Sequence, residues 1–410
     1  MQKPVLTIFY QFNPWRPSIG GIQTVILNFI KFAPSEFEVR LVGTGNRDMP
    51  AGKWYCRSLS GRQLMFFPLF NIEDDDVRHV IPTSVKYTFA LAGKDLASDF
   101  MHFHRLEPAL VSTAWSGHKA LFIHNDVRRE MSASKGNGGI LWRYAPWAYF
   151  SLERFLVHRF DQVLSCNADS SQLYRELYPS VEDRIYTVRN PVDESIFYPF
   201  SSTEIQERRQ NLAQRMSLAP DTRFILFAGR LHPQKDPELL VRAFAELEMP
   251  DIHLLMAGEG ELKQSLNTVI DELGLQGRVT LLGAVGQDQL ANLYRVASVF
   301  ALSSAYEGLP VTVLEALACG CPVVTTQAGE TPKILTTKSG QVAEERTPKA
   351  LSIALSTILD SPQQFAQENC LQAVAPFSAR NVVGEVYRDM WRQWERRMGN
   401  QEAARFSSSY

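Results

Sequence analysis

The sequence predicts an α/β protein with two doubly wound domains, and three observations carry this prediction. Short apolar segments alternate with helical patterns along the chain, which indicates parallel sheets covered by helices. The length of 410 residues exceeds what one ordinary hydrophobic core supports. A polar stretch at 201–209 follows Pro199 and precedes a new apolar segment, so we place the linker near residues 196–222.

The predicted strands are short apolar runs. They cover residues 5–9, 39–42, 120–124, 162–165, 186–189, 224–228, 253–257, 279–282, 299–302 and 322–325. A last helix is expected near residues 381–398, which are rich in aromatic and charged side chains. We therefore predict one domain over residues 1–200 and a second over 201–380, with the last helix after them. Residues 44–100 match no pattern that we can interpret.

The overall composition favours an ordinary globular protein. Hydrophobic residues make up 45% of the chain and charged residues 21%. The formal net charge of −2 gives no support for a nucleic-acid partner, and no apolar run reaches the ~18 residues of a membrane span. The chain moves straight into a strand-like run, so we expect no secretory signal. Five cysteines without a CxxC pair favour reduced thiols in the cytoplasm.

The most informative segment, residues 301–320, contains Glu307 and Glu315 on either side of a helix start. Pro310 suits the first helical position, and Gly320 suits the position just past the helix end. The residues between are apolar nearly all round, so we expect the helix to be buried. An unpaired buried charge is expensive, so Glu315 needs a partner.

The start of this helix has the properties of an anion site. Gly308 leaves room for a ligand to approach the backbone, and free backbone N–H groups at a helix start bind phosphate. The stretch concerned runs from Leu309 through Pro310, which has no N–H of its own, to Val311 and Thr312. A phosphate site beside two carboxylates that accept hydroxyl hydrogen bonds fits a nucleotide sugar. The alternative is a buried helix in which Glu315 binds a neighbouring arginine.

This segment, with residues 319–324 in register, resembles the Glu-x7-Glu motif of retaining glycosyltransferases of family 4, which have the GT-B fold. The resemblance implies two Rossmann-like domains that face a central cleft and a terminal helix that crosses back to the first domain. It implies an acceptor-binding first domain and a second domain that binds the nucleotide sugar. Glu307 would accept hydrogen bonds from the sugar and would be catalytic, and Glu315 would accept them from the ribose.

A second segment of the same domain also resembles this family. Residues 229–236 match its Gly-Arg-Leu…Lys-Gly pattern, with Asp236 where the family usually has glycine. The resemblance implies that Arg230 and Lys235 bind the diphosphate, whose negative charge grows in the transition state. The alternative is a solvated turn. Gly258 opens a Gly-Glu-Gly turn like the one that lies near the base in the family, although a lone Gly-x-Gly is a weak pattern.

Three features of the first domain carry further expectations. Gly20 and Gly21 resemble the family's flexible Gly-Gly loop, the alternative being a plain strand-to-helix turn. His124 follows a strand, and ligands in open α/β sheets lie beyond the carboxyl ends of strands. The resemblance places His124 by the transferred sugar as a catalytic residue, the alternative being a structural histidine. We expect His102 and His104 to be structural.

The resemblance implies transfer of a hexose-type sugar from a UDP- or GDP-sugar to a glycan, a lipid-linked glycan or a small hydroxyl acceptor. No metal or other cofactor is expected, and we interpret the acidic run 74–76 as a solvated loop. By analogy, the setting is polysaccharide or glycoconjugate biosynthesis in the cytoplasm. Aromatic and basic residues at 128–150 suggest peripheral contact with the inner face of the membrane, or packing between helices.

Two other functions remain open. One is a different GT-B activity, such as a nucleotide-sugar epimerase. The other is a non-catalytic module that binds a nucleotide sugar.

Overall fold

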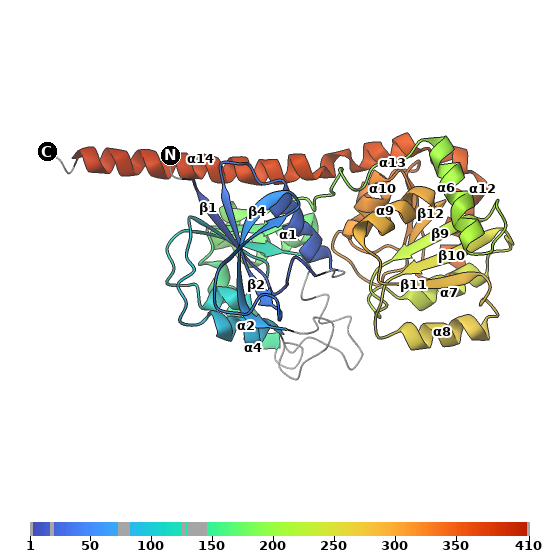
Figure 1. Cartoon of the computed structure of the whole chain (residues 1–410), viewed down its shortest axis with the longest axis horizontal. Coiled ribbons are helices and arrows are strands. Elements are labelled where there is room, and N and C mark those ends of the chain that lie inside the picture. The colour runs from blue at the N-terminus through green and yellow to red at the C-terminus, as the bar shows by residue number, and fades with distance from the viewer. Residues whose placement is uncertain (1–2, 17–19, 73–82, 125–127, 129–145, 408–410) are drawn as a thin grey trace. The chain divides into compact units, whose positions relative to one another are not determined.

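The computed structural model describes residues 3–16, 20–72, 83–124, 128 and 146–407 (Figure 1). The chain divides into two compact units. The first comprises Met1–Asp126, Gly138–Pro191 and Ala379–Tyr410, and the second comprises Val127–Asn137 and Val192–Ser378.

The first unit contains an eight-stranded sheet in the order β3-β4-β2-β1-β5-β6-β7-β8. Its strands are β1 Val5–Phe9, β2 Glu38–Gly45, β3 Tyr55–Leu59, β4 Arg62–Asn71, β5 Phe100–Phe103, β6 His118–Ile123, β7 Gln162–Ser165 and β8 Ile185–Thr187. Strands β3 and β4 form an antiparallel pair, and the other neighbours are parallel.

The described helices of the first unit are α1 Gly21–Lys31, α2 Thr83–Leu91, α4 Pro146–Val157, α5 Ala168–Leu177 and α14 Ala379–Ser407, with the 3-10 helices η1 Glu107–Leu110 and η3 Pro179–Arg184. Helix α14 packs on this unit through aromatic side chains. The Tyr387 hydroxyl donates to the Phe29 carbonyl oxygen at 2.9 Å. The Trp391 ring lies 6.0 Å from that of Phe37.

The second unit contains a six-stranded sheet in the order β11-β10-β9-β12-β13-β14. Its strands, all parallel, are β9 Arg223–Ala228, β10 Ile252–Ala257, β11 Val279–Gly283, β12 Val299–Leu302, β13 Val323–Thr325 and β14 Gly340–Val342. Its helices are α6 Ser202–Arg215, α7 Pro237–Ala245, α8 Lys263–Glu272, α9 Gln287–Val296, α10 Val311–Ala318, α11 Thr331–Ile334, α12 Pro348–Asp360 and α13 Gln367–Val374, with η4 Pro362–Gln364 and η5 Ala375–Phe377.

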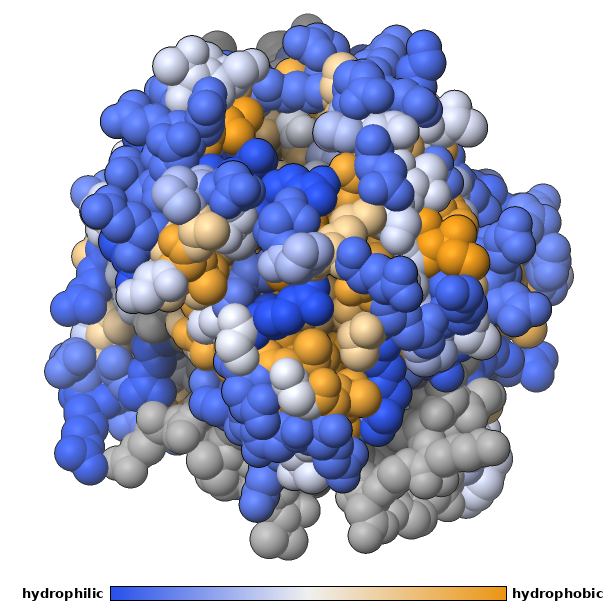
Figure 2. All heavy atoms as spheres, turned by 90° about the vertical axis from the view of Figure 1, so that its right-hand side faces the viewer, coloured by the Kyte–Doolittle hydropathy of each residue, from blue (hydrophilic) through white to orange (hydrophobic). Residues whose placement is uncertain are grey.

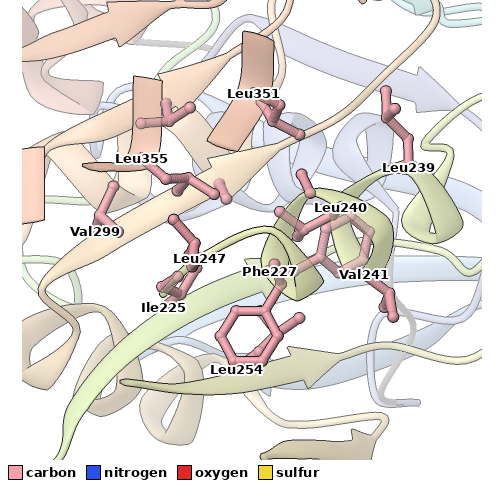
Figure 3. Packing of buried hydrophobic residues seen from close by; sticks show 14 of the residues in the cluster. Ile225, Phe227, Leu239, Leu240, Val241, Leu247, Leu254, Val299, Leu351 and Leu355 are labelled. Atoms are coloured by element: carbon pink, nitrogen blue, oxygen red, sulfur yellow. The ribbon is translucent and has the colours of Figure 1, made fainter. Parts of the chain in front are cut away.

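The core of the second unit lies on both faces of its sheet. Ile225 and Phe227 of β9 pack into one hydrophobic cluster, with α7 and α12 (Figure 3), and Phe224 and Leu226 pack into another. Successive strand residues point to opposite faces, so an entirely apolar strand is buried on both faces, as a sheet covered by helices on both sides requires.

Every predicted strand corresponds to an observed strand, with ends that differ by a few residues. Strands β3 and β4 come from residues 44–100, which showed no interpretable pattern. Most of the predicted linker, residues 196–222, forms α6. This helix begins there because Ser201 and Glu204 form a capping box, which satisfies backbone N–H groups at the helix start.

The outer surface of the molecule is largely polar on the face shown in Figure 2, where hydrophobic areas are small and interrupted by hydrophilic side chains. Among the described residues, no helix combines the length and the apolar character needed to cross a membrane.

Candidate functional site

In the sheet of the second unit, the strand order changes direction between β9 and β12. From β9 the chain continues outward to β10 and β11, and from β12 it continues to β13 and β14 on the other side. Ligands of open α/β sheets bind at this switch point, beyond the carboxyl ends of the strands. The loops that follow the two central strands are residues 229–236 and 303–310, so both predicted donor-binding motifs lie at the switch point.

The two loops bring Lys235 and Glu307 into contact. The Lys235 ammonium Nζ lies 2.5 Å from Glu307 Oε1, and the two side chains are only 14% and 6% exposed. The Ser304 hydroxyl donates to the same Glu307 oxygen at 2.6 Å. A charge-assisted pair of this kind holds its partners more firmly than a neutral hydrogen bond does.

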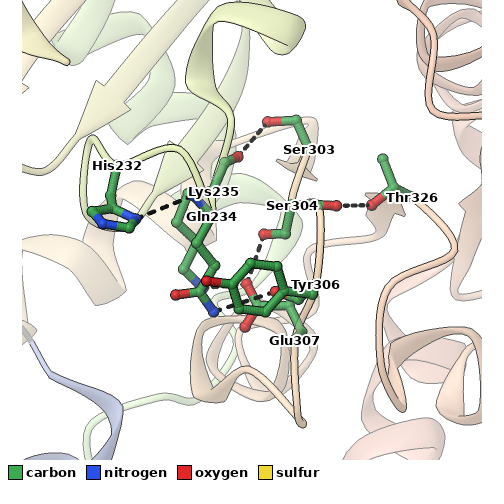
Figure 4. Close-up of polar contacts among 8 residues, drawn as sticks. All are labelled: His232, Gln234, Lys235, Ser303, Ser304, Tyr306, Glu307 and Thr326. Atoms are coloured by element: carbon green, nitrogen blue, oxygen red, sulfur yellow. Dashed lines mark hydrogen bonds and ion pairs between the residues drawn. The ribbon is translucent and has the colours of Figure 1, made fainter. Parts of the chain in front are cut away.

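Further hydrogen bonds join the two loops (Figure 4). The Ser303 hydroxyl lies 2.9 Å from the Lys235 carbonyl oxygen and 2.7 Å from that of Asp236. The Ala305 N–H donates to the Gln234 carbonyl oxygen at 2.8 Å. The Gln234 side chain in turn donates to the carbonyl oxygen of Tyr306, two residues further along, at 3.2 Å. The loops therefore form one connected platform.

Arg230 lies on the first of these loops. Its side chain is exposed and makes no hydrogen bond or ion pair with any residue that the structure describes. Its guanidinium can therefore reach an incoming anion without breaking an existing contact.

Asp236 begins α7 in the left-handed conformation, with φ of 43°. This is a region that glycine adopts readily and that aspartate tolerates better than most residues. Asp236 therefore gives the loop a backbone shape that glycine would also provide. Its side chain caps α7 by accepting from the Leu239 N–H at 3.3 Å and forms an ion pair with Arg346.

Helix α10 carries the second glutamate. Glu315 is 4% exposed, and the Tyr294 hydroxyl on α9 donates to its Oε2 at 3.2 Å. Burial raises the Glu315 pKa to about 7, against a smaller lowering by the Tyr294 hydrogen bond. The partner that a buried glutamate requires is thus a tyrosine.

The start of α10 differs slightly from the prediction. Pro310 is the extended N-cap, and Val311 is the first helical residue. Leu309 and Val311 are buried. The Thr312 hydroxyl oxygen is also buried, without a hydrogen-bond partner among the residues that the structure describes. Gly320 follows the helix with φ of 78°, as predicted for the position past its end.

Two glycines allow neighbouring loops to approach the platform. A Cβ on Gly258 would lie 1.8 Å from the Gly229 carbonyl oxygen, so the turn after β10 packs directly on the loop after β9. A Cβ on Gly329 would lie 2.2 Å from the Gly308 carbonyl oxygen. The next residue, Glu330, donates its N–H to that same oxygen at 2.9 Å. Four strand ends therefore contribute to one surface.

The first unit has its own switch point, between β1 and β5. His104 follows β5 and His124 follows β6, and their rings lie side by side, with His104 Nδ1 2.8 Å from His124 Nε2. Burial lowers the His124 pKa to about 3, with a further contribution from Arg105. Burial, together with the neighbouring His124 and His102, lowers the His104 pKa well below its usual value. Both imidazoles are therefore neutral at neutral pH.

His102 was predicted to be structural, and its surroundings are those of a core residue. It is 2% exposed, and its ring lies 4.9 Å from that of Phe122. Burial, and to a smaller extent His118, lowers its pKa to about 3.

The Gly-Gly loop leads into α1. Gly20 is the N-cap with an extended backbone, and Gly21 is the first helical residue. The Gln23 side-chain oxygen folds back over Gly20, where a Cβ would lie 3.2 Å from it. Within the described part of the chain, this buried oxygen has no hydrogen-bond partner.

Two predictions fall outside the described residues, in full or in part. The acidic run 74–76 does so completely, as does most of the aromatic and basic segment 128–150. Within the described part of that segment, Trp147 on α4 is 75% exposed. No group of three or more His, Cys, Asp or Glu side chains in the described parts of the chain is arranged to hold a metal ion.

The structure adds two residues that the sequence did not single out, Ser304 and Tyr294. Ser304 lies three residues before Glu307 in the same loop, so its proximity alone could have drawn attention to it. Tyr294 lies on a different helix, and only the general need of a buried carboxylate for a partner pointed to such a residue.

Comparison with known proteins shows which proteins this chain is similar to. Residues 208–372 match the family described as Glycosyl transferases group 1. An uncharacterized glycosyltransferase of Methanocaldococcus jannaschii is 29% identical over 205 residues, which cover 50% of this chain and 52% of that protein. A D-inositol 3-phosphate glycosyltransferase of Mycolicibacterium smegmatis is 29% identical over 237 residues, or 56% of this chain and 52% of that protein. The chain thus spans about half the length of these curated relatives.

Solved structures resemble the chain over nearly its full length. Sucrose-phosphate synthase from Thermosynechococcus elongatus has a TM-score of 0.76 at 19% identity, covering 95% of this chain and all of that one (100%). WaaG, a glycosyltransferase involved in lipopolysaccharide biosynthesis, has a TM-score of 0.69 at 15% identity, covering 94% and 99%. At such identities the likeness shows the fold. Residues 208–372 are therefore similar to the group 1 glycosyl transferases, within a chain that has the GT-B fold.

Proposed function

We propose that this protein is a retaining, metal-independent glycosyltransferase that moves a hexose-type sugar from a nucleotide diphosphate sugar to a hydroxyl acceptor. One observation carries the proposal: Lys235 and Glu307, from two different loops, meet at the switch point of the second unit. A cation for the diphosphate and a carboxylate for the sugar hydroxyls are the two groups that such a donor requires. Arg230 lies in the same loop as Lys235, and Glu315 lies on α10, which follows the loop that contains Glu307.

The donor would be held through charge and hydrogen bonds. Lys235 and Arg230 would bind the diphosphate, the start of α10 would contribute backbone N–H groups, and the turn at Gly258 would lie by the base. Glu315 would accept hydrogen bonds from the ribose, and Glu307 from the sugar. A similar Anabaena structure is described in complex with UDP and glucose (TM-score 0.68, 15% identity), which supports a UDP-sugar as donor.

The reaction would proceed with same-face attack. The acceptor hydroxyl oxygen forms a bond to the anomeric carbon while the bond from that carbon to the diphosphate oxygen breaks. The leaving phosphate takes the acceptor proton, and Lys235 and Arg230 stabilise the charge that develops on the diphosphate. The first unit would supply the acceptor site, with His124 and the loop at Gly20 and Gly21. The name of the Mycolicibacterium relative supports a polyol acceptor.

The experiment is a thermal-shift screen against UDP, GDP, ADP and their sugar conjugates. A ligand that binds the folded state raises the unfolding temperature, so we expect one nucleotide series to stabilise the protein and Lys235→Ala to abolish the shift. Lys338→Ala is the matched control. Lys338 is exposed and precedes β14, so it lies near the amino ends of the parallel strands, whereas the site lies beyond their carboxyl ends. A flat response from a folded protein would favour a different function.

Transfer itself is tested with Glu307→Gln, which keeps the size of the side chain and removes its charge. We expect the rate of transfer to fall on the order of a hundredfold or more, while the protein stays folded. An unchanged rate would remove Glu307 from the site.

Product formed without acceptor would identify an epimerase, and donor binding without turnover on any acceptor would identify a binding module.

Peripheral membrane contact is a second proposal, supported by α4. Trp147 and Phe155 on this helix are 75% and 46% exposed, and Arg154 and Arg159 lie near them in sequence. Aromatic side chains beside basic ones favour the surface of an anionic membrane. Co-sedimentation with anionic vesicles tests this proposal, and Trp147→Ser should reduce the bound fraction. Equal sedimentation of both proteins would contradict it.

A further inference from the structure

We infer that Ser304 is a positioning residue that aims the carboxylate of Glu307 at the sugar of the donor. This inference deepens the proposed function and rests on it. It assigns a role in recognising the sugar to a serine whose hydroxyl would act through Glu307 and not on the donor itself.

The geometry of Glu307 carries the inference. Oε1 accepts two hydrogen bonds, from Ser304 Oγ at 2.6 Å and from Lys235 Nζ at 2.5 Å. Oε2 has no hydrogen-bond partner among the described residues. One carboxylate oxygen is therefore fully used by the protein, and the other is left to accept hydroxyl hydrogen bonds. A carboxylate accepts hydrogen bonds at both oxygens, so Oε2 is the atom that faces a ligand.

Lys235 alone would not fix this orientation. The last torsion of a glutamate side chain has a broad, two-fold profile, and a lysine ammonium is a point charge on a flexible stem that can follow either oxygen. A second donor from a different direction fixes the rotation of the carboxylate plane. Ser304 provides that donor from the same loop as Glu307.

Ser304 is itself held firmly. Its side chain is completely buried (0% exposed), and its carbonyl oxygen accepts from the Thr326 hydroxyl at 2.6 Å. On one side, the Ser303 hydroxyl binds the Lys235 and Asp236 carbonyl oxygens, and on the other the Ala305 N–H binds the Gln234 carbonyl oxygen. Such support holds a binding side chain in its productive geometry before the ligand arrives.

The test compares Ser304→Ala with Ser265→Ala. Ser265 is the matched control, because its hydroxyl also donates to a glutamate, Glu238, at 2.5 Å but on the exposed surface. Calorimetry would measure the affinity of each protein for the nucleoside diphosphate and for its sugar conjugate. We expect Ser304→Ala to keep the affinity for the nucleoside diphosphate within about twofold and to weaken binding of the sugar conjugate about tenfold, as loss of one hydrogen bond to a charged group implies. Ser265→Ala should change neither.

Equal weakening of both ligands by Ser304→Ala would overturn the inference, because it would indicate a purely structural role. Unchanged affinity for both ligands would overturn it as well. A second measurement does not depend on the donor: in a crystal structure of Ser304→Ala, the Glu307 carboxylate should be rotated, and an unchanged carboxylate would contradict the inference. If the unsubstituted protein bound no nucleotide sugar, the proposed function would fail, and the crystal structure would still decide whether Ser304 orients Glu307.

Discussion

Burial governs the behaviour of Glu315. The residue is 4% exposed, and burial raises its pKa from 4.5 to about 7. The folded protein therefore keeps a proton that the unfolded chain releases between about pH 4.5 and 7. The stabilisation from this group is fully present below pH 4.5 and is lost as the pH rises through about 7.

Glu315→Gln should remove this pH dependence. Glutamine is neutral at every pH, so the variant should be more stable than the parent at pH 8, by up to roughly 3 kcal/mol. Urea unfolding at pH 5 and pH 8 measures the effect. If the parent and the variant lost the same free energy of unfolding between the two pH values, the burial argument would be wrong. Under the proposed function, nucleotide binding should weaken despite the gain in stability, since the ribose would lose its proposed acceptor.

The connection between β9 and α7 contains a residue other than glycine in the left-handed conformation. Asp236 has φ of 43°, where glycine is unstrained and alanine is not. We expect Asp236→Gly to change stability by only a few tenths of a kcal/mol, because glycine is nearly as good an N-cap. Asp236→Ala should cost about 2 kcal/mol, from the lost cap and the strained backbone. Denaturant unfolding of both variants measures this, and equal stabilities would contradict it.

The elements that the sequence predicts well are those with a buried apolar pattern. Strand β9 is apolar throughout because both of its faces pack against helices. Strand β3 has side chains that are exposed or half-buried along its whole length, so no apolar pattern marks it. Strand β14 consists of Gly340, Gln341 and Val342, so it contains no apolar run that would mark it.

The candidate site could be predicted in part for a similar reason. The spacing of Glu307 and Glu315 and the helix between them are local in the sequence. The contact of Lys235 with Glu307 spans 72 positions and depends on the order of the strands, which places β9 next to β12. No local pattern contains that information, and the same holds for the hydrogen bond of Tyr294 to Glu315.

For the whole molecule, we predict that acid destabilises the first unit. His102, His104 and His124 have lowered pKa values, mainly because they are buried, and those of His102 and His124 are about 3. The unfolded chain binds protons at these residues below about pH 6.5, and the folded unit does not. Stability from these groups is therefore present above pH 6.5 and falls as the pH drops toward 3.

Hydrogen exchange at pH 7 and pH 5, corrected for the intrinsic rate, measures this loss. Peptides from β5 and β6 should lose protection at pH 5. His102→Gln introduces a side chain that stays uncharged at both pH values. The change should weaken the packing at pH 7 and pH 5 alike, and the protection of β5 and β6 should depend less on pH. Constant protection of β5 and β6 would show that the three histidines do not control the acid response.

The pairing of Lys235 with Glu307 has a consequence for product release. In the free protein the carboxylate already neutralises the ammonium, so a nucleoside diphosphate must compete with an internal anion. In the proposed reaction, the ion pair of Lys235 with Glu307 would tighten again once the sugar has been transferred, which would hasten departure of the spent nucleotide. Glu307→Gln should therefore bind the nucleoside diphosphate more tightly, with a steeper dependence on salt, because an un-neutralised cation is screened more by added ions. Calorimetric titrations at low and high ionic strength measure both effects. A carboxylate in this position would thus shorten the lifetime of the product complex as well as recognise the sugar.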